Sequence, residues 1–78
     1  MANTHLKNHI LQVVDNQLRA NDPPITKATY ERLQSAGYKK QQIKEWIAAI
    51  LLEEMYDVLK NHEIFNEDRY AKRLKGLK

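Results

Sequence analysis

Apolar residues recur along this chain at intervals of three and four positions, which is the spacing of one buried face of an α-helix. Few β-branched residues alternate with polar ones, so the pattern predicts no β-strand. It predicts an all-α fold, a compact bundle of three main helices plus a short C-terminal fourth helix. The four helices are expected at about residues 4–20, 23–36, 39–61 and 67–75.

Residues that stop or start helices separate these segments. Pro23 and Pro24 lack the amide hydrogens that the first helix needs in order to continue. Asp22 is a suitable N-cap for the second helix, with Pro23 in its first turn. Gly37 is suited to the left-handed backbone that ends this helix. We therefore expect short connections between the helices.

The fourth predicted helix is short but has signals at both ends. Asn66 is a preferred N-cap residue, and Phe65 and Tyr70 occupy the two positions of a hydrophobic staple. Acidic residues follow the cap and basic residues come towards the end, as the helix dipole favours. Gly76 is expected to end the helix.

The composition fits one globular domain, residues 1–78, near the lower size limit for a core that supports itself. Apolar residues make up 42% of the chain and charged residues 29%, which argues against disorder. The chain has no cysteine, no apolar run of about 18 residues and no segment typical of a signal peptide, so we expect a cytoplasmic protein that does not span a membrane. The net charge of +3 is a mild basic bias, much of it in the tail RYAKRLKGLK.

The third predicted helix is apolar over much more than half of its circumference. An arc this wide predicts packing by several neighbours or by a second copy of the chain, so a homodimer through this helix is one alternative. Trp46, Met55 and Tyr56 belong either to the core or to a groove for an unidentified protein partner. The apolar positions of the arc are Ile43, Trp46, Ile47, Ile50, Leu51, Met55, Val58 and Leu59.

Each of the first three helices also places one polar residue, Gln17, Arg32 or Glu54, on its apolar face. Burying an unpaired carboxylate costs several kcal/mol, so we predict a core network in which Arg32 forms a forked pair with Glu54 and Gln17 adds a donor. The network would either fix the register of the helices or place a carboxylate with a shifted pKa in a small polar site. The structural role is favoured, because so short a chain has little volume for a substrate pocket.

The segments VVDNQLRANDPP, YERLQSAGY and IAAILLEEMYDVL resemble a family of small all-helical bacterial proteins of unknown function. The resemblance rests on a valine-acid-Asn-Gln-Leu run, an Asn-Asp-Pro-Pro break, an Arg-Leu pair and a glycine before the long helix. It covers about residues 9–74 and implies a helical fold but no activity. Relatives often have histidines where this chain has Leu11, Gln41 and Glu45, so no site built on those histidines carries over.

Patterns for catalysis or metal binding are weak in this sequence. His5 and His9 have the i, i+4 spacing at which two imidazoles can reach one metal ion. A structural site needs about four ligands, however, and no obvious third ligand is placed near them. The sequence contains no nucleophile beside a base and no glycine-rich phosphate loop. We expect no enzyme activity, no metal and no cofactor.

The segment SAGYKKQQIKEWI loosely resembles a helix-turn-helix, although Leu33 stands where that motif usually has a small residue. Lysine and glutamine are residue types that contact phosphates and bases. We predict a small accessory or protein-interaction module without catalytic activity, and the alternative is weak nucleic-acid binding through this segment and the basic tail. The candidate nucleic-acid contacts are Lys39, Lys40, Gln41, Lys44, Lys72, Arg73 and Lys75.

Overall fold

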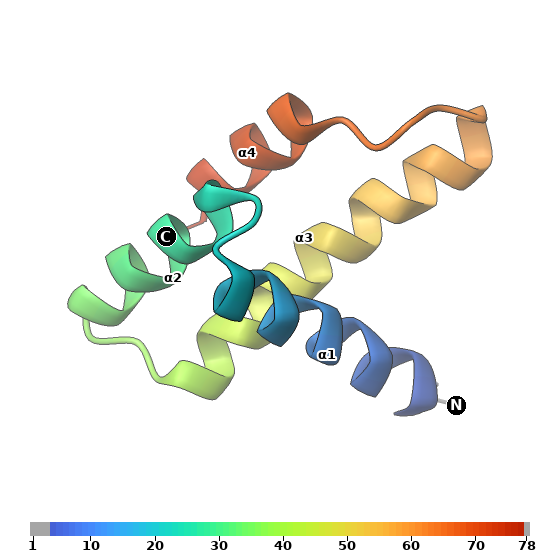
Figure 1. Cartoon of the computed structure of the whole chain (residues 1–78). Helices are drawn as coiled ribbons and strands as arrows, with labels where there is room; N and C mark the ends of the chain where they lie inside the picture. Colours follow the sequence, from blue (N-terminus) through green and yellow to red (C-terminus); the bar gives the residue numbers. More distant parts are fainter. Residues whose placement is uncertain (1–3, 78) are drawn as a thin grey trace.

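The structure is a computed structural model that describes residues 4–77. Over this range the chain forms four helices with short connections and no strand, as predicted (Figure 1). The helices are α1 (Thr4–Ala20), α2 (Pro24–Ser35), α3 (Lys40–Asn61) and α4 (Glu67–Lys75). α1 and α4 have the predicted bounds, whereas α2 is one residue shorter at each end and α3 begins one residue later.

α3 is the longest helix, and each of the other three packs against it. α1 crosses α3, and α4 runs back alongside α3 in the opposite direction (Figure 1). α2 packs against both α1 and α4. In the part of the chain that the structure describes, α1 and α4 have no close backbone contact with each other. Within residues 4–77, no helix covers the side of α3 that carries Ala49, Leu52 and Tyr56, all of which are exposed.

The core receives apolar side chains from every helix. Because α3 has three neighbours, its wide apolar arc is accounted for without a second copy of the chain. Leu59 departs from the prediction, since it is exposed near the end of α3. The buried apolar residues are Ile10, Val14, Leu33, Ile43, Ile47, Ala48, Leu51, Tyr70 and Leu74.

The start of α2 corrects the predicted cap. Pro23, not Asp22, is the N-cap, and it makes no side-chain capping bond. Pro23 has an extended backbone (φ −74°, ψ 151°) because the proline that follows it disfavours helical ψ, so the helix can begin only at Pro24. At the other end of α2, Gly37 has the predicted role, although the helix ends one residue earlier than expected. Gly37 has a φ of +100°, and the amide of Tyr38 then donates to the carbonyl of Leu33 over 3.2 Å.

The start of α4 follows its predicted signals. Asn66 Oδ1 accepts a hydrogen bond from the amide of Arg69 at 3.0 Å, and Gly76 is the C-cap. The rings of Phe65 and Tyr70 meet edge to face with centroids 5.4 Å apart, which confirms the hydrophobic staple. His62 has a role that we did not predict, because it ends α3 in the left-handed conformation with a φ of 54°.

Candidate functional site

Glu54 is buried and ion-paired, as predicted, but its partner is different. Its side chain has no exposed surface, and Arg69 of α4 donates from Nε to Oε1 at 2.7 Å and from Nη2 to Oε2 at 2.6 Å. The amide of Asn66 donates to Oε2 at 3.2 Å, and Arg73 Nη1 lies 3.6 Å from Oε1. The forked pair is therefore made with Arg69, and the predicted pair with Arg32 is wrong.

Arg32 and Gln17 have other partners in this structure. Arg32 is exposed on α2, and its guanidinium donates to the carbonyls of Leu74 and Leu77 at 3.2 and 3.1 Å, at the C-terminal end of α4. Gln17 Oε1 accepts from Thr26 Oγ1 at 2.9 Å and from Tyr70 Oη at 3.1 Å. The three residues of the predicted network therefore do not contact one another. Glu54 connects α3 to α4, Gln17 connects α1 to α2 and α4, and Arg32 connects α2 to the C-terminal end of α4.

The surroundings of Glu54 give it a structural role. The hydrogen bond from Arg69 holds the pKa of Glu54 below its ordinary value, although burial opposes this effect. The ion pairs extend outward, because Arg73 Nη2 lies 2.6 Å from Asp57 Oδ2 and Arg69 Nη1 lies 3.3 Å from Glu63 Oε1. Glu54 has no exposed surface and both of its carboxylate oxygens accept hydrogen bonds from Asn66 or Arg69, so it joins α3 to α4.

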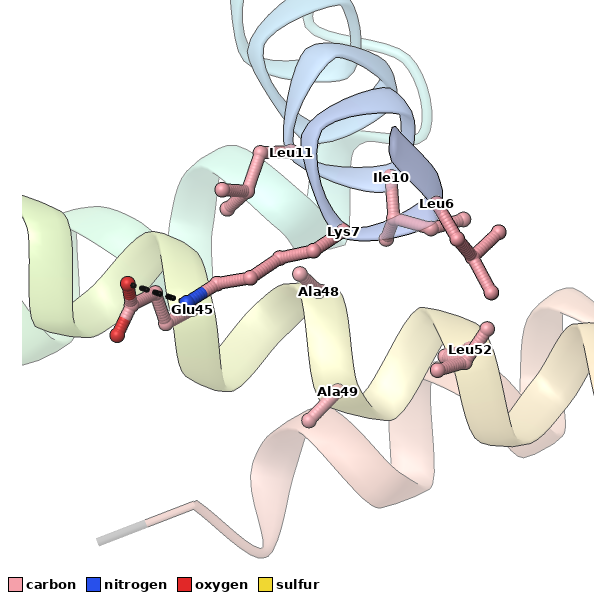
Figure 2. Close-up of a pocket in the computed structure, with 8 residues that line it drawn as sticks. All are labelled: Leu6, Lys7, Ile10, Leu11, Glu45, Ala48, Ala49 and Leu52. Atoms are coloured by element: carbon pink, nitrogen blue, oxygen red, sulfur yellow. Dashed lines mark ion pairs between the residues drawn. The ribbon is translucent and has the colours of Figure 1, made fainter. Parts of the chain in front are cut away.

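The open side of α3 carries an apolar hollow of about 320 Å³ between α1 and α3. Figure 2 shows Leu6 and Leu52 facing each other at one end of the hollow. At the other end, Lys7 reaches from α1 to Glu45 of α3, with Nζ 3.4 Å from Oε2 (Figure 2). The residues that line the hollow are Leu6, Lys7, Ile10, Leu11, Glu45, Ala48, Ala49 and Leu52.

A second hollow continues the first along α3 towards α4. Ala49 and Leu52 line both hollows, and the second, of about 420 Å³, adds Tyr56 of α3. Its charged lining comes from Glu53, Asp57 and Arg73. We call the joint surface the α3 groove and define it by its apolar residues, Leu6, Leu11, Ala49, Leu52 and Tyr56.

The predicted groove residues do not lie together. Trp46 is half-buried and packs edge to face on Tyr38, with ring centroids 5.0 Å apart, and Met55 is half-buried against the core. Only Tyr56 of the three lines the α3 groove. Nine residues correspond to about two and a half turns of helix, so Trp46 and Met55 point to opposite sides of α3.

Most of the α3 groove was missed by sequence reasoning. Leu52 is the residue that could have revealed it, because it is a large apolar residue outside the predicted core arc. Ala49 lies three residues before Leu52 and Tyr56 lies four residues after it, so all three lie on one face of α3. Leu6 lies four residues before the buried Ile10, which is the spacing of a core residue, but its side chain is 41% exposed.

The predicted nucleic-acid contacts are divided between free and paired side chains. Lys44 Nζ lies 2.8 Å from Asp15 Oδ1, and Gln41 donates to Glu45 at 3.4 Å. Arg73 is paired with Asp57, as described above. The structure therefore offers less unpaired positive charge than the sequence predicted; Lys78 of the basic tail lies outside the described residues. The remaining candidates, all exposed, are Lys39, Lys40, Lys72 and Lys75.

The described residues contain neither a metal-binding cluster nor a membrane-spanning helix. His5 and His9 are exposed on the first turns of α1. Between residues 4 and 77, no three side chains of His, Cys, Asp or Glu are grouped closely enough to hold a metal ion. Within the same range, no helix combines the length and apolar character that crossing a membrane requires.

Comparisons of the chain with protein families, with curated proteins and with solved structures gave no match. The resemblance of residues 9–74 to a helical bacterial family therefore stays a prediction.

Proposed function

We propose that this chain is a small cytoplasmic protein-interaction module without catalytic activity, which binds a helix of another protein in the α3 groove. One observation carries the proposal. Leu6 and Leu52 are each 41% exposed and Tyr56 is 62% exposed, and all three line the same uncovered side of α3. Single exposed apolar residues are ordinary, but a contiguous set with a charged rim is typical of an interaction surface.

The shape of the α3 groove supports a helix as the bound element. Its floor is formed by Ile10 and Ala48, which are buried, and by Ala49, whose small side chain allows another helix to approach α3 closely. Leu6 and Leu11 of α1 form one wall. An amphipathic helix that lays its apolar face into a groove between helices is a common mode of recognition.

Two further features support a role in binding. The buried carboxylate of Glu54 is used to join α3 to α4, so the strongest candidate for a polar site is occupied by a structural contact. α3 is held by all three other helices, which makes the groove a preformed surface that loses little conformational freedom on binding.

The absence of cysteine agrees with the proposed location in a reducing cytoplasm.

The proposal is tested with a displayed library of helical peptides about 16 residues long, a length at which helices begin to persist in water. Each peptide has leucines fixed along one face of its helix, and the positions that flank this face are varied among Lys, Gln and Glu. Ala49→Glu places a charge in the middle of the groove, and Ala28→Glu places the same charge on exposed α2 as the matched control.

We expect the wild-type protein and Ala28→Glu to enrich the same peptides. Ala49→Glu should lose that enrichment by at least about tenfold, because a buried, unpaired charge is costly. Circular dichroism establishes that both variants are folded. Peptides that bind Ala49→Glu as well as wild type, or a library that yields no peptides, would overturn the proposal.

A further inference from the structure

The length of the α3 groove limits the helix that it can hold. Its α3 side extends from Glu45 to Tyr56, a stretch of 12 residues that spans about 17 Å along the helix axis. A partner helix that follows this line makes contact over about three turns. It would therefore bring three apolar side chains to Leu6, Leu52 and Tyr56, at spacings of three or four residues.

The charges at the rim of the groove are mostly paired within the protein. Glu45 is paired with Lys7 and Asp57 with Arg73. Glu53 is exposed beside Leu52 and Tyr56 and has no ion-pair partner among residues 4–77. The uncompensated charge at the groove is therefore negative, although the chain as a whole has a net charge of +3.

We infer that the occupant of the α3 groove is a basic amphipathic helix of another protein, with about three turns in contact and a lysine or arginine placed opposite Glu53. This inference rests on the proposed function and adds the charge of the partner to it. A basic side chain at that position would pair with Glu53 and extend the alternation of charges that Lys7–Glu45 and Asp57–Arg73 already form along the rim.

A second copy of this chain fits the groove less well. The rim cations of a second copy, Lys7 and Arg73, are already paired with Glu45 and Asp57, so its groove has no unpaired cation among the described residues to place opposite Glu53. The exposed apolar surface of the α3 groove also comes mainly from three large side chains, whereas a stable interface needs about 800 Å² from each partner. A short helix needs much less.

The same peptide library tests the charge of the partner separately from the existence of the site. With wild-type protein, we expect peptides with Lys opposite Glu53 to be enriched about two- to fivefold over otherwise identical peptides with Gln, the range for an exposed ion pair, and peptides with Glu to be depleted. Glu53→Lys should reverse this order. Glu31→Lys, the same change on exposed α2, should leave the order unchanged.

Three results would overturn the inference. Enrichment that depends on Ala49 but shows no preference for Lys would leave the groove as a helix site and remove the basic partner. A preference for Lys that Glu53→Lys and Glu31→Lys change equally would assign it to the overall charge of the protein. Twice the monomer mass of 9.2 kDa by light scattering, lost in Ala49→Glu, would identify a second copy as the occupant.

Discussion

Arg69 holds both carboxylate oxygens of Glu54, with Nε 2.7 Å from Oε1 and Nη2 2.6 Å from Oε2. The two residues belong to α4 and α3 and lie fifteen positions apart in the chain. Glu54 has no exposed surface, whereas Arg69 is 28% exposed. The pair therefore joins the short fourth helix to the central helix from inside the bundle, and only the Arg69 side chain remains partly in contact with water.

Glu54→Gln removes the charge that Arg69 and Arg73 surround. We expect the free energy of unfolding to fall by about 3 kcal/mol, at the lower end for a broken buried ion pair because Arg69 is partly exposed. Urea denaturation followed by circular dichroism measures the change. Glu53→Gln is the matched control, since the neighbouring glutamate is exposed, and it should cost less than about 0.5 kcal/mol. Equal effects would contradict the structural role of Glu54.

The stability of the protein should depend on pH through the same residue. The hydrogen bond from Arg69 holds the pKa of Glu54 below its ordinary value of 4.5. A lowered pKa contributes stability that is fully present above about pH 4.5 and is lost as the pH falls through the folded-state pKa. The urea midpoint of wild type should therefore decrease on acidification more steeply than that of Glu54→Gln. Parallel curves would show that the carboxylate is not paired.

Asp57 also contributes to this acid response. Its hydrogen bond from Arg73 holds the pKa of Asp57 below its ordinary value. For this reason, Glu54→Gln should reduce the acid sensitivity without abolishing it, and Glu54→Gln combined with Asp57→Asn should reduce it further. The midpoints of the single and double variants over the same pH range check this order.

Tyr70 provides a second buried polar contact between α4 and the rest of the bundle. Its hydroxyl donates to Gln17 Oε1 at 3.1 Å, and burial raises the pKa of Tyr70 above 10.0. Tyr70→Phe should cost about 1 kcal/mol at neutral pH. A raised tyrosine pKa gives stability that is present below pH 10 and lost above it, so wild type should lose more stability than Tyr70→Phe at high pH. Tyr56→Phe, at an exposed position, should change neither quantity; a similar loss in both variants would contradict the assignment.

Gly37 is required by the backbone and not by packing. Its φ is +100°, and a Cβ added there would meet no atom within 4 Å. Gly37→Ala should therefore cost about 1–2 kcal/mol through the left-handed conformation alone, and Gly37→Asn less. Gly76→Ala is the control, because Gly76 has a φ of −77° and should be neutral or slightly stabilised by alanine. Thermal denaturation of the three variants decides between these effects, and an equal loss for Gly37→Ala and Gly76→Ala would be the contrary result.

Local signals predicted the helices well, because helix boundaries depend on neighbouring residues in the chain. Asn66, Gly37 and the Phe65–Tyr70 staple each act on residues only a few positions away in the chain. Each behaves as the sequence predicted. The wrong cap at Asp22 has the same kind of cause, since the effect of Pro24 on Pro23 shifts the start of α2 by one residue.

The partners of the inward polar residues depend on how helices pack, which spacing alone does not determine. The helical period placed Glu54 correctly in the core, but it could not show that α4 would supply Arg69 and that Arg32 would lie at the end of α4. The α3 groove was missed for a related reason. Periodicity identifies which residues share a face of α3, whereas the uncovered face is determined by where α1 and α4 pack.

Binding in the α3 groove is measured most directly by amide NMR spectra of ¹⁵N-labelled protein during titration with the most enriched library peptide. We expect the largest shifts at Leu6, Ala49, Leu52 and Tyr56, and no saturable shifts in Ala49→Glu. Shifts centred on the start of α3 at Lys39 and Lys40, with an unchanged α3 groove, would contradict the account and move the binding site to the basic segment.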